Sequence, residues 1–391
     1  MPQDNSGRAP FDPNGTAAHE RLRRVRATTQ PPGRPADGRV FVYAGRRLGG
    51  VWLSDVDLQT VTLAAGGLMV DEQEAGTALA MLRNGVNVPL MLDPARYLPS
   101  NERISQPSLW SADPLSAVVE GQAQHRVAAY LSPAGFIRAG DLGALRAVLD
   151  EGLRFTELTS QQSHRAPALT ALPINTGWLS RPELREPFIK TIVEAGIGVA
   201  LFPGGSGDPL GGQKAVAGLV EMLRAMHHEV AVLRTDLAGI GAMAFGAAAA
   251  SIGLSAALLH TVAAGGRAFA QQDRTPRVLV DRLLSWPRGS QLAQVVRDNG
   301  ILTCECPVCH GRSLRRFARE DAEVVGEAAT HSVLTWRAIA DRMLAVPPAG
   351  RRAAWLQACA DALDEHAALR ARSRIGLQVP DYLNSWTALP A

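Results

Sequence analysis

Cysteine, lysine and long apolar runs are all scarce in this chain, and each scarcity limits what the protein can be. Of four cysteines, three fall within six positions, too close together for unstrained disulfides, and no secretory signal opens the chain. We therefore expect a cytoplasmic protein with reduced thiols. Lysine occurs only at Lys190 and Lys214, so arginine carries nearly all the positive charge. The most apolar stretch, residues 242–259, is mostly alanine and glycine, which argues against a membrane span.

The length and composition allow a large buried core. With 391 residues, 46% of them hydrophobic, the chain has room for two or three domains, although one α/β barrel could use most of it. A net charge of +3 is too small to indicate a nucleic-acid partner by itself. Residues 1–38 are rich in proline and polar residues, which predicts a disordered N-terminal arm.

From residue 39 onwards, short apolar runs alternate with amphipathic stretches. The predicted strands are residues 40–44, 60–65, 88–92, 127–131, 168–173, 198–202, 229–233 and 250–254, and the predicted helices between them are 72–83, 141–153, 182–195, 213–227 and 237–246. This alternation predicts a parallel sheet covered by helices, as a (β/α)8 TIM-like barrel over residues 39–300. An open doubly wound sheet is the alternative. The segment 256–301 shows no clear pattern, and helices are predicted at 334–345 and 353–373.

The three clustered cysteines are the strongest chemical signal. Cys304, Cys306 and Cys309 form a C-x-C-x2-C pattern, and three thiolates with one imidazole make a closed tetrahedral shell for structural Zn²⁺. His310 and His331 compete for the fourth position. His310 directly follows Cys309, and adjacent side chains rarely converge on one ion, so we predict His331.

The sequence around these cysteines resembles the tRNA-guanine transglycosylase family. That family has C-x-C-x2-C, a serine four residues later, an acidic and apolar helix, and a histidine that opens a long helix. Here Ser313 matches the serine, and the His-Asn pair reads His331-Ser332. The resemblance is specific over about residues 303–343 and only architectural before them. It implies a barrel followed by a zinc-binding subdomain with C-terminal helices, here residues 301–391.

The carboxyl ends of the predicted strands are where a barrel carries its chemistry. They offer Asp93, Asn175, a glycine-rich turn at residues 203–212 that includes Asp208, and the stretch 234–236 that ends in Asp236. Simpler interpretations stand beside these: Asp93 as a turn residue, Asp236 as a helix cap, and the glycines as a tight turn. His164 and His260 have no partner at a recognisable spacing, and Cys359, Trp336 and Trp355 are typical of helix packing.

The resemblance also implies how such a site would work. Base exchange needs one carboxylate that attacks the ribose and one that handles the proton of the base. Asp93 lies where the family has Asp-Ser-Gly-Gly, and Gly204 and Gly205 match the glycines of a Val-Gln-Gly-Gly base-binding motif. The family's nucleophilic aspartate ends the last strand, where residues 251–255 carry no carboxylate. Asp236, one strand earlier, is then the candidate nucleophile, and Ser255 a candidate binding residue.

Three functions remain open from the sequence. The first is base exchange at guanine in tRNA or DNA, with guanine or a 7-deazaguanine as the incoming base. The second is a non-catalytic nucleic-acid-binding or partner subunit, because the resemblance implies homo- or hetero-oligomers through the zinc region. The third is an unrelated barrel enzyme that uses Asp93 and Asp236 on a small molecule.

Overall fold

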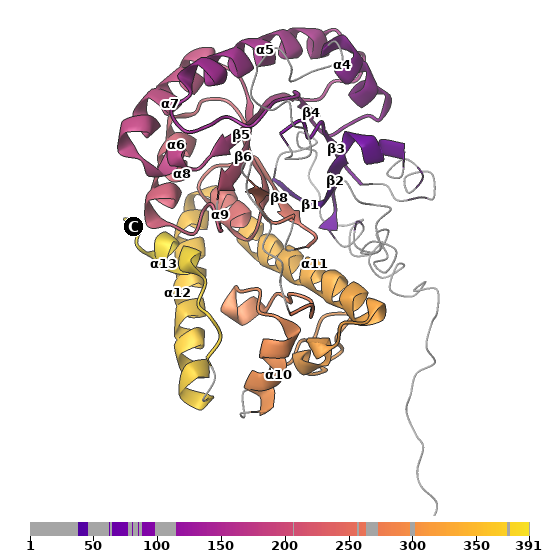
Figure 1. The fold of residues 1–391 in the computed structure, drawn as a ribbon, viewed down its shortest axis with the longest axis vertical. Helices are drawn as coiled ribbons and strands as arrows, with labels where there is room; N and C mark the ends of the chain where they lie inside the picture. Colours follow the sequence, from indigo (N-terminus) through magenta and orange to yellow (C-terminus); the bar gives the residue numbers. More distant parts are fainter. Residues whose placement is uncertain are drawn as a thin grey trace, which may run out of the picture. The chain divides into compact units, whose positions relative to one another are not determined.

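Eight parallel strands follow one another around a nearly closed barrel (Figure 1). The computed structural model describes residues 38–45, 62, 65–76, 80, 85, 88–97, 115–205, 207–255, 258–262, 273–297, 302–373 and 376–390. The strands are β1 (Arg39–Gly45), β2 (Leu68–Asp71), β3 (Leu90–Asp93), β4 (Tyr130–Leu131), β5 (Ala168–Asn175), β6 (Val199–Gly205), β7 (Val230–Thr235) and β8 (Ala249–Gly253), with a short β9 (Thr261–Val262) beside β6.

Strand pairing identifies the fold. From β4 to β8, consecutive strands pair with each other. β8 then pairs with β1, β1 with β2, and β2 with β3. A parallel bridge between Met91 and Ala129 joins β3 to the start of β4 and completes the ring. Sequential pairing around a ring is the TIM-barrel arrangement, so the predicted (β/α)8 barrel is confirmed and the doubly wound sheet is excluded.

The helices cover the barrel and build the C-terminal part. They are α4 (Leu115–Gln124), α5 (Leu142–Ser160), α6 (Gly177–Ser180), α7 (Pro182–Ala195), α8 (Gln213–Ala225), α9 (Ala238–Ala244), α10 (Gly289–Arg297), α11 (Ala322–Ala345), α12 (Pro348–Arg372) and α13 (Asp381–Thr387), with 3-10 turns η1 (Glu72–Glu74), η3 (Asp281–Leu283) and η4 (Leu314–Ala318). None of the helices in the described ranges has both the length and the apolar character needed to cross a bilayer.

The strand predicted at residues 60–65 is wrong. Thr62 and Ala65 are helical, and the strand beside β1 is β2, which begins three residues after Ala65. Gly66 explains the change, because its φ is +79° and its amide donates a hydrogen bond to the Thr62 carbonyl, which ends a helical turn there. Gly67 then lets the chain pass the Phe41 ring, where a Cβ atom would lie 2.8 Å from a ring carbon.

Two hydrophobic clusters lie in the described part of the chain. The larger one fills the barrel and reaches α11, α12 and α13 through Trp336, Trp355 and Trp386, all fully buried. The smaller one joins residues 278–295 to residues 302–328, with Cys309 and Phe317 inside it. Residues 278–295, which belong to the segment that the sequence left unassigned, therefore pack against the cysteine-bearing part of the chain. Residues 1–37 of the predicted arm lie outside the described residues.

Candidate functional site

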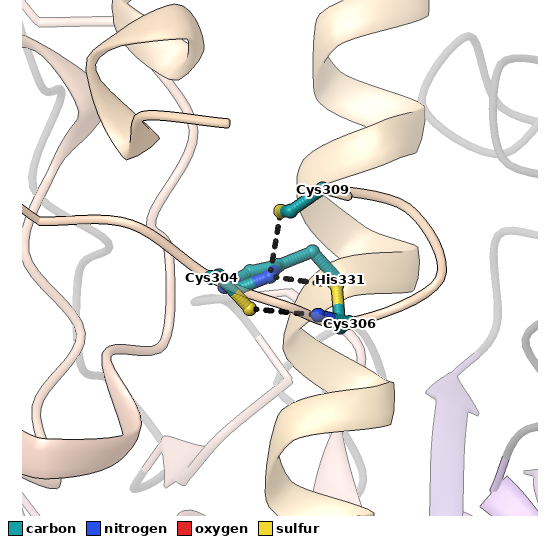
Figure 2. A group of neighbouring side chains, drawn as sticks. All are labelled: Cys304, Cys306, Cys309 and His331. Atoms are coloured by element: carbon teal, nitrogen blue, oxygen red, sulfur yellow. Dashed lines mark hydrogen bonds between the residues drawn. The ribbon is translucent and has the colours of Figure 1, made fainter. Parts of the chain in front are cut away.

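Three sulfurs and one imidazole converge next to α11. Figure 2 shows Cys304, Cys306 and Cys309 on one loop, facing His331 from the helix. Nδ1 of His331 lies 3.3 Å from Sγ of Cys309 and 3.5 Å from Sγ of Cys306. Zinc bonded tetrahedrally to sulfur and nitrogen would hold those atoms about 3.6 Å apart, so the spacing fits. The four ligand atoms all lie within 4.8 Å of one another, and the group could hold a metal ion.

Hydrogen bonds around the group orient its ligands. Nε2 of His331 lies 2.8 Å from the Leu279 carbonyl, which fixes the proton on Nε2 and leaves Nδ1 unprotonated toward the sulfurs. The amide of Cys306 donates to Sγ of Cys304 over 3.4 Å, and Arg316 donates to Sγ of Cys309 over 3.6 Å. Donors of this kind offset the negative charge of a thiolate. His310 is exposed and lies outside the group.

The loop geometry explains why the cysteines can share one ion. The amides of Cys309 and His310 both donate to the Cys306 carbonyl, and the amide of Gly311 donates to the Cys304 carbonyl. Gly311 has a φ of +74°, a conformation that glycine adopts without strain. These bonds fold the chain back on itself and bring all three sulfurs to one side.

A second group of polar side chains lies at the carboxyl end of the barrel strands, around Asp93. Its carboxylate is buried and accepts hydrogen bonds from the Tyr97 hydroxyl (2.6 Å), the Tyr43 hydroxyl (3.2 Å) and the Ala95 amide (2.8 Å). Burial raises the pKa of Asp93 to about 6, although the Tyr97 and Ala95 bonds oppose the shift. Asp93 can therefore change its protonation state close to neutral pH.

Arg234 covers this group from β7. Its guanidinium carbon lies 5.3 Å from the centre of the Tyr43 ring and 5.8 Å from that of Tyr97. Arg234 is buried, and its Nε and Nη1 atoms have no hydrogen-bond partner in the described structure. The residue has a φ of +55°, which is strained for a side chain of this size, and its amide donates to the Ser251 hydroxyl over 2.6 Å.

A third group joins Asp208, Asp236 and His260. Each offers one ligand atom, and these atoms lie within 4.8 Å of one another; Oδ2 of Asp236 is 4.0 Å from Nε2 of His260. Burial raises the pKa of Asp236 to about 6, and burial together with the charge of Asp236 raises the pKa of Asp208 to about 7. Burial also lowers the pKa of His260, against the attraction of Asp208.

The predicted catalytic residues thus belong to different groups. Asp93 contacts tyrosines, whereas Asp236 faces Asp208 and His260, and the charge of Arg234 acts on both Asp93 and His260. The sequence interpretation of His260 as a structural residue missed its approach to Asp236. Both aspartates also cap their own turns, because Asp236 accepts a bond from the Ala238 amide as Asp93 does from Ala95.

The surroundings of the predicted binding residues show that each also has a role in the packing or the backbone of the barrel. A Cβ atom on Gly204 would lie 2.7 Å from the Phe136 ring and 3.0 Å from the Thr261 carbonyl, so β9 needs a glycine there. Gly205 ends β6 beside Thr176. Ser255 follows β8, is partly buried, and its carbonyl accepts a bond from the Leu258 amide.

An arginine-lined groove lies beside the cysteine loop. It has a volume of about 560 Å³ and is lined by Arg312, Ser313, Arg315, Arg316, Arg319, Glu323, Val324 and Glu327. Glu327 pairs with Arg312 and Arg316, and Asp321 pairs with Arg319. Arg315 is exposed, and no carboxylate in the described part of the chain pairs with it. The groove therefore carries excess positive charge.

Comparisons with known proteins give no family for this chain. No family model and no curated protein matches it. Among solved structures, a tryptophan synthase complex from Pyrococcus furiosus is similar at 13% identity and a TM-score of 0.31, over 56% of this chain and 88% of that chain. The 3-dehydroquinate dehydratase from Aquifex aeolicus VF5 is similar at 10% identity and a TM-score of 0.33, over 58% and 93%. The fold assignment here follows from the strand pairing.

Proposed function

We propose that Cys304, Cys306, Cys309 and His331 hold a structural Zn²⁺. Three sulfurs and one imidazole nitrogen are a donor set that zinc prefers, and four protein ligands leave no open position for substrate. The ion would fasten the cysteine loop to α11. Reduced thiols are required as ligands, which favours a cytoplasmic location.

We propose further that the chain is a divergent relative of the tRNA-guanine transglycosylases and exchanges a base at guanine in tRNA or DNA. One observation carries this proposal: His331 meets the three cysteines in the arrangement that the resemblance implied, in a chain that also contains a (β/α)8 barrel. Guanine or a 7-deazaguanine would be the incoming base.

In this proposal Asp236 is the nucleophile and Asp93 the acid or base. A carboxylate oxygen of Asp236 bonds to the ribose C1′ while the C1′–N bond to guanine breaks, and a proton from Asp93 satisfies the departing base. The reverse sequence installs the new base, which returns its proton to Asp93. A pKa of about 6 for Asp93 supports a proton-transfer role. Gly204, Gly205 and Ser255 are the candidate contacts to the base.

The groove beside the cysteine loop would bind the nucleic acid. Arginine guanidinium groups match the geometry of phosphate oxygens, and Arg315 has no carboxylate partner in the described structure. Binding there would place the polynucleotide on the zinc-bearing part of the chain while one base enters the barrel.

Exchange of labelled guanine into tRNA tests this function. Purified protein should incorporate the label, and Asp236→Asn and Asp93→Asn should each abolish incorporation. Asp150→Asn on the exposed side of α5 is the matched control and should keep full activity. Incorporation that survives Asp236→Asn would contradict the assignment of the nucleophile.

A non-catalytic, nucleic-acid-binding subunit is the second candidate. It is favoured by the end of β8, where residues 251–255 carry no carboxylate, and by the three hydrogen bonds that already occupy Asp93. Such a subunit would bind tRNA or DNA without incorporating guanine. It would also associate with itself or with a catalytic partner through the zinc-bearing region, which sedimentation of the purified protein can test.

A further inference from the structure

Three elements bring Asp208, Asp236 and His260 together at the carboxyl end of the barrel. Asp208 lies in the turn after β6, Asp236 directly follows β7, and His260 directly precedes β9. Because β7 pairs with β6 at residues 199–201 and β9 pairs with β6 at residues 204–205, the three segments meet at the carboxyl end of β6. This group lies outside the Cys3His cluster and shares no ligand with it.

The two carboxylates each direct one oxygen away from their own backbone. Oδ1 of Asp208 accepts the Leu210 amide over 2.9 Å, and Oδ1 of Asp236 accepts the Ala238 amide over 2.8 Å. The side chain of Asp236 is only 7% exposed. Its Oδ2 lies 4.0 Å from Nε2 of His260, which is too distant for a hydrogen bond. A nearly buried carboxylate that faces a second carboxylate and an imidazole is a candidate ligand for a cation.

From these positions we infer that Asp208, Asp236 and His260 bind a second divalent cation, with ligand positions left open for water or substrate. Atoms bonded at about 2.1 Å to one ion lie about 3.0 to 4.2 Å apart, depending on whether they are adjacent or opposite. The 4.0 Å between Asp236 and His260 is within that range, and a small side-chain movement suffices for the rest. Two carboxylates would neutralise the charge of the ion.

The donor set selects the kind of ion. Imidazole favours first-row transition ions over Mg²⁺ or Ca²⁺, and two hard oxygens suit Mn²⁺ as well as Zn²⁺. Burial keeps His260 neutral at pH 7, as a ligand must be. The surrounding charges are mixed: Asp381 adds negative potential at Asp208, whereas Arg234 and Arg277 oppose a cation near His260.

This inference goes beyond base exchange, because cation binding can be measured with no nucleic acid present. The two assignments meet at Asp236, which cannot be a free nucleophile while it holds an ion. If the protein exchanges bases, a cation at this site should therefore inhibit the reaction.

Titration with Mn²⁺, followed by the loss of the free-ion EPR signal, tests the site in the full chain. Zinc-loaded protein should take up one Mn²⁺ per chain, and excess Zn²⁺ but not Mg²⁺ should displace it. Asp236→Asn, Asp208→Asn and His260→Gln should each weaken Mn²⁺ binding at least about 10-fold. His227→Gln, which changes an exposed histidine two residues after α8, is the matched control and should bind as the parent does.

The retained zinc of the Cys3His group reports whether each variant is folded. Asp208→Asn changes the most accessible turn of the three, so it serves as the second variant if Asp236→Asn does not fold. The inference is overturned if the parent protein binds no Mn²⁺, or if folded variants at the three positions bind it unchanged.

Discussion

His331 donates a hydrogen bond from Nε2 to the carbonyl of Leu279 over 2.8 Å. The next residue of α11 completes the contact, because the Ser332 hydroxyl accepts the Leu279 amide over 3.1 Å. One turn of the helix therefore binds both backbone groups of one residue in the segment before the cysteine loop. The same contact orients a metal ligand and attaches that segment to α11, so metal binding and packing depend on each other.

We predict that removing the metal unfolds the cysteine-bearing region. Small zinc modules gain on the order of 10 kcal/mol from the ion, more than a module of this size gains from its core. Elemental analysis should find zinc bound at this group in the parent and its loss in Cys309→Ser and His331→Ala, and both variants should melt at lower temperature. Cys359→Ala, a change in the buried face of α12, should keep its zinc. A full complement of zinc in Cys309→Ser would refute the ligand assignment.

Ser332→Ala removes the hydrogen bond to the Leu279 amide and leaves the His331 contact with the Leu279 carbonyl in place. The substitution leaves the buried Leu279 amide without an acceptor, which costs about 1 to 3 kcal/mol. Chemical denaturation should show that loss, while the zinc content of the folded protein stays the same because His331 is intact. Ser160→Ala, whose hydroxyl bonds to a carbonyl at the exposed end of α5, should cost much less. Equal losses in the two variants would contradict the role of Ser332.

The sequence predicted features that depend on neighbouring residues. The helix at 182–195 was predicted correctly because proline occupies its first position and Gly196, with a φ of +65°, ends it. The cysteine spacing indicated the metal group because three of its four ligands are close neighbours in the sequence. By contrast, Asp208, Asp236 and His260 meet only because β9 pairs with β6, a contact between distant segments that no local pattern encodes. Tyr43 likewise reaches Asp93 through strand pairing, because β2 pairs with both β1 and β3, whereas Tyr97 lies only four residues from Asp93 in the sequence.

Burial of Asp93 predicts a specific dependence of stability on pH. Its pKa is about 6 in the folded protein and about 4 when unfolded, so between these values the folded state binds more protons. The contribution of Asp93 to the free energy of unfolding is therefore fully present below about pH 4. It declines by roughly 3 kcal/mol as the pH rises through 6. Asp93→Asn, which has no charge to bury, should match the parent near pH 4 and exceed it in unfolding free energy at pH 7.

Urea denaturation of both proteins at several pH values measures this difference. Asp150→Asn again serves as the control, because it alters a carboxylate on the exposed face of α5. The stability difference between Asp93→Asn and the parent should change from pH 4 to pH 7. A constant difference would show that burial does not destabilise the charged form of Asp93.

We expect tRNA binding in the arginine groove to weaken as the salt concentration rises. Each arginine that contacts a phosphate displaces counterions, so its loss lowers the dependence of binding on salt concentration by about one unit of slope in a logarithmic plot. Arg315→Ala should therefore weaken tRNA binding and reduce that slope, while the zinc content remains unchanged. Arg146→Ala on α5, an exposed arginine far from the cysteines in sequence, is the control. Unchanged affinity and slope in Arg315→Ala would exclude the groove as a phosphate-binding surface, whatever the barrel does.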